Sequence, residues 1–133
     1  MNVKGLSSYE LVLELEGGES VPIILERYRA PLVIERLVSL LPLRARLFRS
    51  SKGDYVYIPL SFPQKIGLSG RDTRLSKGDV AFMAFNQSLF ICLRDVIPSY
   101  PSMIIGRVKD LSSLGVFADI RESISVVMRS HEA

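Results

Sequence analysis

Two adjacent segments near the N-terminus alternate between apolar and charged residues with a period of two. In residues 9–16 (YELVLELE), a tyrosine and three leucines fall on one face and three glutamates on the other. Residues 20–26 (SVPIILE) repeat the alternation after Gly17 and Gly18, which readily form a tight turn. A strand buried on one face has this periodicity, so the two segments predict a β-hairpin.

Short apolar segments of strand length recur along the rest of the chain. Turn residues such as SSKGD and NQS separate them, which is typical of antiparallel strands. Two of the segments are continuously apolar rather than alternating. The further predicted strands are LRARLF (43–48), YVYIPL (55–60), VAFMAF (80–85), LFICL (89–93), MIIGRV (103–108) and SISVVM (123–128).

One long stretch has the period of a helix instead. In residues 29–42 (RAPLVIERLVSLLP), Val33, Leu37 and Leu41 share one stripe with their apolar neighbours, and polar side chains occupy the opposite side. A proline is acceptable in the first turn of a helix, and Pro42 ends the pattern. A second, short helix is predicted in DLSSLGVF (110–117), capped by the aspartate.

About eight short strands with one main and one short helix predict a mainly β protein. We expect a closed antiparallel β-barrel of the cyclophilin-like kind, because closure leaves no strand edge exposed. The 133 residues suit one domain, spanning 1–133, with a single core. The main helix would cover an open end of the barrel and bury its apolar stripe there.

The composition excludes several classes of site. Cys92 is the only cysteine and His131 the only histidine, which argues against a zinc site and against a catalytic triad that contains histidine. We therefore expect no metal and no cofactor. The net charge of +3 is modest, so nucleic acid is disfavoured as a partner. Without a long apolar run or an N-terminal signal sequence, we expect no membrane association and a cytoplasmic location.

Several segments follow one another in the order known from a family of small proteins. They are the helix APLVIERLVSLLP, the strand YVYIPL, Lys77-Gly78-Asp79 opening VAFMAF, the segment LFICL, and Ile105-Gly106-Arg107-Val108 followed by Asp110 and Leu114. In this combination the chain resembles the small cyclophilin-like domain proteins of bacteria and archaea, from about Tyr9 to Met128. The resemblance implies a reduced cyclophilin barrel, in a family largely without an assigned activity.

One strand is similar to part of the cyclophilin active site. Cyclophilins carry an Arg-x-Ile-Pro-x-Phe-x-x-Gln run, and this chain has Ile58-Pro59 followed by Phe62 and Gln64. Val56 stands at the place of the arginine, and the chain has no tryptophan. The resemblance therefore implies the wall of a cyclophilin groove without the usual prolyl isomerase chemistry.

Aromatic residues near this strand predict a groove on the barrel wall for an apolar or proline-containing ligand. The alternative is that these rings are ordinary barrel core, which we favour for Phe82. The candidate groove residues are Arg46, Tyr57, Pro59, Phe62, Gln64 and Phe85.

Our leading hypothesis is a cyclophilin-like binding module for a peptide or small ligand. The first alternative is a weak peptidyl-prolyl cis/trans isomerase in which Arg46 or Arg71 replaces the missing arginine. The second is a nucleic-acid-binding barrel that uses a basic strip formed by Arg44, Arg46 and Lys52.

Two glycine-containing motifs have a structural and a functional interpretation. Gly78-Asp79 could supply a carboxylate to a site, but a turn is the better prediction because aspartate hydrogen-bonds the local backbone. Gly106 could let a ligand approach the backbone, but a bend or bulge in a barrel strand is favoured.

Overall fold

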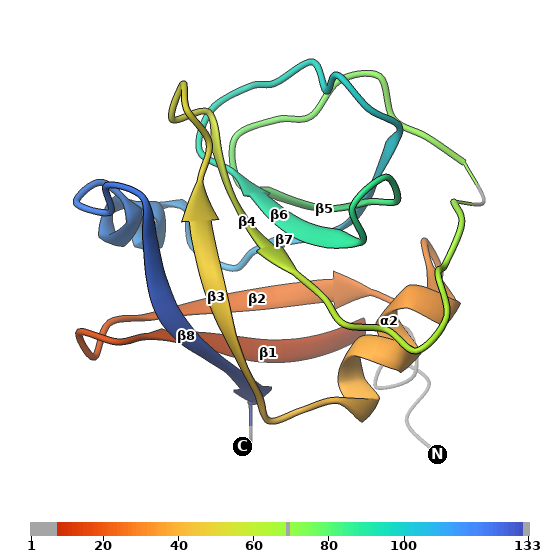
Figure 1. The fold of residues 1–133 in the computed structure, drawn as a ribbon, viewed down its shortest axis with the longest axis horizontal. Coiled ribbons are helices and arrows are strands. Elements are labelled where there is room, and N and C mark those ends of the chain that lie inside the picture. Colours follow the sequence, from red (N-terminus) through yellow and green to blue (C-terminus); the bar gives the residue numbers. More distant parts are fainter. Residues whose placement is uncertain (1–7, 69, 132–133) are drawn as a thin grey trace.

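The computed structural model describes residues 8–68 and 70–131 and is mainly β, as predicted. Eight antiparallel strands form a closed barrel in the order β1-β2-β7-β5-β6-β4-β3-β8 (Figure 1). The strands are β1 (Ser8–Leu15), β2 (Ser20–Glu26), β3 (Leu43–Arg49), β4 (Tyr55–Pro59), β5 (Asp79–Met83), β6 (Ser88–Cys92), β7 (Ser102–Val108) and β8 (Ser123–Ser130).

Strands that are distant in the chain complete the barrel. The predicted hairpin of β1 and β2 is present, with Leu11 opposite Ile23. β8 pairs with both β1 and β3, and β7 lies between β2 and β5. Each strand thus has two neighbours, so backbone groups that an open sheet would expose at its edges are paired.

The barrel interior is filled by the inward-facing residues of the alternating strands. Leu11 and Leu13 of β1 and Val56 and Ile58 of β4 are completely or almost completely buried. Each such aliphatic side chain contributes about 1.5–3 kcal/mol by leaving water. In β4 these residues alternate with exposed or half-buried ones, so the period-two pattern correctly indicated the inward face, whereas in β1 Val12 between the two leucines is also buried.

The main helix, α2 (Pro31–Ser39), is shorter than the predicted stretch and covers one end of the barrel. It buries Val33, Ile34 and Leu37, whereas Leu41 lies beyond the helix and is only partly buried. The backbone N–H of Leu40 bonds back to Leu37, which tightens the last turn before the chain reaches Pro42. Within the described residues, no helix is long and apolar enough to cross a membrane.

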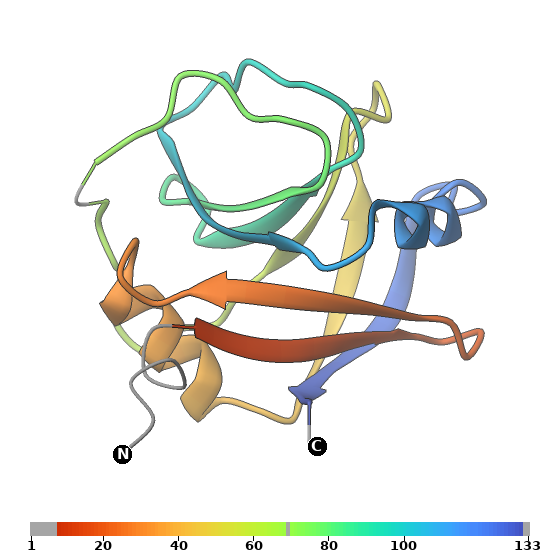
Figure 2. The same ribbon diagram turned by 180° about the vertical axis from the view of Figure 1, so that it is seen from behind.

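The short helix η1 (Leu111–Phe117) covers the opposite end of the barrel (Figures 1 and 2). As predicted, Asp110 caps it: the carboxylate accepts a hydrogen bond of 3.0 Å from the backbone N–H of Ser112. Leu114 and Phe117 are buried in the same core as α2. The two helices therefore pack against the two ends of one apolar interior.

The outer faces of β5 and β6 are also covered. Residues 70–77 and 94–101 cross this side of the barrel, as the green and teal loops of Figure 1 show, and are joined where Leu75 and Val96 exchange two backbone hydrogen bonds of 2.8 Å. Leu75 packs there in a second apolar cluster with Met83, Phe90 and Cys92. Because both faces are buried, these two strands have continuous apolar sequences.

The two glycine motifs behave as predicted. Gly78 has a φ of 91° in a turn, and the Asp79 carboxylate accepts a 2.7 Å hydrogen bond from the backbone N–H of Ser76. Gly106 lies at an irregularity where the pairing of β5 with β7 shifts between Val80 and Ala81. Both glycines therefore have structural roles in this fold.

The connection between β5 and β6 begins earlier than expected. The turn comprises residues 84–87, so Phe85 leaves the strand and becomes exposed. Gln87 takes a φ of 53°, and its side chain accepts a hydrogen bond of 2.9 Å from the backbone N–H of Ile66. The same side chain donates to the carbonyls of Ile66 and Ala84 at 3.0 and 2.7 Å. These contacts fasten the loop after β4 to the turn.

Candidate functional site

A row of aromatic side chains crosses the outer face of the barrel. Tyr57 of β4 pairs with Phe48 of β3 on one side and with Phe90 of β6 on the other. The rings of Phe48 and Tyr57 stack at a centroid distance of 5.5 Å, and Tyr55 packs against Phe90 at 5.2 Å. Since alternate residues of a strand share a face, Tyr55 and Tyr57 both point outward while Val56 and Ile58 fill the core.

Two aromatic residues from separate loops form one end of this surface. Phe85 from the β5–β6 turn stacks on Tyr100 from the segment before β7, with centroids 4.3 Å apart and ring planes within 11°. They are 65% and 47% exposed. Two adjoining hollows of about 280 and 260 Å³ lie along this face. We call the combined surface the aromatic groove; it is lined by Tyr55, Tyr57, Met83, Phe85, Phe90 and Tyr100.

Polar groups surround the aromatic groove. Arg49, Ser50 and Ser51 lie along one side, and Asn86 and Ser88 lie near Phe85. One N–H of the Arg49 guanidinium already donates a 3.1 Å hydrogen bond to the backbone carbonyl of Ile120. The groove therefore combines an apolar floor with hydrogen-bonding groups at its rim, the composition expected of a ligand site.

The tyrosine hydroxyls are suited to meet a ligand. Among the described residues, neither Tyr55 nor Tyr57 has a hydrogen-bond partner for its hydroxyl. Burial raises the pKa of Tyr55, and the neighbouring Tyr57 and Asp54 raise it further. Its hydroxyl therefore stays protonated at neutral pH and can donate or accept a hydrogen bond.

The structure separates the six residues predicted for the groove. Tyr57 and Phe85 line it. Phe62 is half-buried, with its ring 6.2 Å from Phe82 of the barrel core, and Pro59 and Gln64 are exposed outside the groove. Arg46 donates hydrogen bonds of 3.0 and 3.1 Å to the hydroxyls of Ser123 and Ser125, on the wall formed by β3 and β8.

Sequence reasoning did not single out Arg49, Phe90 and Tyr100 as groove residues. Phe90 belongs to a continuously apolar strand, which carries no sign of which face a residue takes. Tyr100 lies in the irregular PSYPS segment, and its contact with Phe85 depends on the path of that loop. The outward positions of Tyr55 and Tyr57 could have been found from the alternation of β4 alone.

The basic strip considered for nucleic acid has acidic neighbours. Arg44 lies beside Glu14 and Glu16 in a shallow hollow where β1, β3 and β8 meet. Carboxylates at this position oppose the approach of a phosphate backbone. This surface therefore lends the nucleic-acid hypothesis no support.

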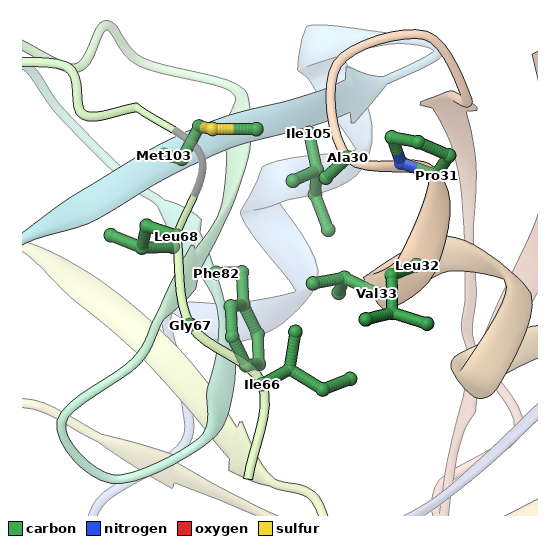
Figure 3. Close-up of a pocket in the computed structure, with 10 residues that line it drawn as sticks. All are labelled: Ala30, Pro31, Leu32, Val33, Ile66, Gly67, Leu68, Phe82, Met103 and Ile105. Atoms are coloured by element: carbon green, nitrogen blue, oxygen red, sulfur yellow. The ribbon is translucent and has the colours of Figure 1, made fainter.

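A second cavity lies at the α2 end of the barrel and has a volume of about 190 Å³. We call it the mouth pocket. Figure 3 shows Val33, Ile66 and Ile105 arranged around a common space together with the ring of Phe82. The pocket is lined by Ala30, Pro31, Leu32, Val33, Ile66, Gly67, Leu68, Phe82, Met103 and Ile105.

Cys92 lies beneath the aromatic groove and is expected to be unreactive. Its side chain is completely buried, and burial together with Asp79 and Asp95 raises the pKa of the thiol to about 12. At pH 8 a thiol-specific disulfide reagent should therefore react at least about a thousandfold more slowly than with the unfolded chain. Reaction at the rate of the unfolded chain would contradict this burial.

The same pKa difference links Cys92 to stability. Since the folded state favours the neutral thiol, the contribution of Cys92 to the free energy of unfolding is fully present below about pH 8.5. It declines as the pH rises toward about 12.

Among the residues that the structure describes, no group of three or more His, Cys, Asp or Glu side chains is placed so that it could hold a metal ion.

Comparisons with known proteins identify the fold. No family model matches the chain, and a search of curated proteins finds no significant match. The hypothetical protein AF2241 from Archaeoglobus fulgidus is similar in structure, with a TM-score of 0.73 and 17% identity, over 94% of this chain and 96% of AF2241. McbB, determined in complex with tryptophan, has a TM-score of 0.74 and 22% identity over 92% of this chain. The match covers 45% of McbB. At these identities the likeness shows a shared barrel fold.

Proposed function

We propose that this protein is a binding module that holds a proline-containing peptide segment in the aromatic groove. The observation that carries the proposal is the exposed stack of Phe85 on Tyr100 beside the outward-facing Tyr55 and Tyr57. Isolated exposed rings are common on protein surfaces, but a hollow lined by several of them usually marks a binding site.

The chemistry of the groove favours proline in particular. A polyproline II segment is already extended and has few conformations to lose, so it docks in aromatic-lined grooves at a low entropic cost. Proline rings would pack between the faces of Tyr57 and Phe85. The free tyrosine hydroxyls and the Arg49 guanidinium could bond the peptide carbonyls, which have no partner within such a helix.

Two further considerations support the proposal without deciding it. McbB, 45% of which matches this fold, was determined in complex with tryptophan, so a protein that contains such a barrel binds a ligand with a ring. We also propose that the protein is related to the small cyclophilin-like proteins. Two observations support this relationship: the closed barrel of eight antiparallel strands and the position of Pro59 at the end of β4. Because one fold hosts many activities, the groove itself carries the functional argument.

A titration with a capped ten-residue proline-rich peptide, followed by amide chemical shifts, tests this proposal. We expect saturable shifts around Tyr55, Tyr57 and Phe85, with a dissociation constant on the order of 10–100 μM. Phe85→Ala should weaken binding by about tenfold or more, because truncating a hot-spot residue typically costs about 2 kcal/mol or more.

Tyr28→Ala is the matched control for this experiment. Tyr28 is 67% exposed but lies after β2, outside the aromatic groove, so its removal should leave peptide affinity unchanged. Equal losses in Phe85→Ala and Tyr28→Ala, or the absence of saturable shifts, would refute the groove. Exchange spectra of the same peptide also test the isomerase alternative. We expect no acceleration of cis/trans exchange, because Arg46 is bonded to Ser123 and Ser125 on another wall.

A further inference from the structure

We propose that the mouth pocket is a second binding site, which takes a small uncharged ring compound of one or two fused rings. Within the part of the chain that the structure describes, it shares no lining residue with the aromatic groove. The pleat of β5 separates the two sites, because Phe82 points inward to the mouth pocket and the next residue, Met83, points outward to the groove. The proposal therefore stands independently of peptide binding.

The chemistry of the pocket wall sets the class of ligand. Among the described residues, no side chain of the wall carries a charge, and the weakly accepting sulfur of Met103 is its one polar atom. A charged ligand would lose its hydration without gaining a partner, which is costly. Water is also poorly held, since an ordered buried water needs about 2–4 polar partners. An uncharged, largely apolar molecule is the occupant that gives up least hydration on entry and gains by leaving water.

The size of the pocket sets the size of the ligand. Its volume of about 190 Å³ exceeds that of the engineered cavity of about 150 Å³, lined by Leu, Ile and Phe, that binds benzene. The ring of Phe82 and the thioether of Met103 are groups that pack favourably against an aromatic ring. One or two fused rings should therefore fit.

The pocket is formed before any ligand arrives. Ile66 is fixed on one wall because Gln87 bonds both its backbone N–H and its carbonyl. Phe82 and Ile105, on β5 and β7, are completely buried in the barrel. A preformed apolar wall reduces the ordering cost of binding. At the rim, Pro31, Leu32 and Gly67 are exposed, so a small molecule can enter without opening the barrel.

The test uses indole as the probe and the methyl groups of the pocket as reporters. We expect saturable shifts at the methyls of Val33, Ile66, Met103 and Ile105, with a dissociation constant on the order of 0.1–1 mM. Zwitterionic tryptophan should bind there at least about tenfold more weakly, because the described side chains of the wall offer no partner for its charges. Lack of saturable shifts with indole, or equal affinity for tryptophan, would overturn the proposal.

A pair of variants locates the site. Ala30→Leu adds a larger side chain to the wall and should weaken indole binding by at least about tenfold. Tyr57→Ala alters only the aromatic groove and should leave indole affinity unchanged. The reverse pattern would move the indole site to the groove and refute the inference. If Ala30→Leu does not fold, the methyl shifts of the unaltered chain decide the question alone.

Discussion

Replacing Gly106 with alanine should destabilise the barrel by about 3–5 kcal/mol. A Cβ atom at this position would lie 2.1 Å from the carbonyl oxygen of Ile24 and 2.9 Å from the Cα of Leu25. Both are backbone atoms of β2, so the clash cannot be relieved by a change of side-chain conformation. β2 and β7 would have to separate, and the hydrogen bonds between them would lengthen. Urea unfolding, followed by circular dichroism, measures the loss.

Gly115→Ala is the control, because a Cβ there meets no atom within 4 Å. We expect this variant to unfold within about 0.5 kcal/mol of the unaltered protein, as most unhindered surface substitutions do. A Gly106→Ala protein of equal stability would show that β2 and β7 can move apart without cost, which the closed barrel does not allow.

The second large effect is expected at Gln87, which links the β5–β6 turn to the loop after β4. Gln87→Ala removes three hydrogen bonds from a side chain that is 8% exposed and leaves backbone groups of Ile66 unpaired. We expect a loss of about 2–4 kcal/mol, because buried polar groups without partners are costly. Denaturant unfolding measures it, and faster amide exchange at Ile66 would locate the change.

Two further substitutions separate the effect of the lost hydrogen bonds from the effect of the positive φ at Gln87. Gln87→Gly loses the same hydrogen bonds but relieves the φ of 53°, so it should be about 1 kcal/mol more stable than Gln87→Ala. Gln64→Ala removes an exposed glutamine from the same loop and should be nearly neutral. If Gln87→Ala were as mild as Gln64→Ala, the side chain of Gln87 would not be what holds Ile66.

Much of the fold could be predicted because local periodicity reports burial. The alternation in residues 9–16 and 20–26 predicted the first hairpin, and the continuous runs in residues 80–85 and 89–93 correspond to strands covered on both faces. The aspartate at position 110 correctly indicated the cap of the short helix η1. The end of the helix was less well predicted, because Leu41 continues the apolar period although the chain has already left the helix.

The candidate site was predicted only in part, for reasons of geometry. Tyr57 was selected because it adjoins the long loop after β4, and it lines the groove because it lies on the outer face of that strand. Phe62 and Gln64 were selected by resemblance to the cyclophilin run that includes Pro59, but the chain turns after β4 and takes them away from the outer face. Tyr100 was missed because nothing local indicates that an irregular segment returns to lie against Phe85.

The sequence by itself therefore determined the strands, the two helices and the apolar face of each element whose pattern is periodic, since these depend on neighbours within a few residues. Only the tertiary structure decided the order of strands around the barrel. That order pairs Tyr57 with Phe90, brings the turn at Phe85 to the loop at Tyr100, and leaves a cavity between Val33 and Phe82. These contacts join residues that are far apart in the chain, and the packing of the closed barrel as a whole selects them.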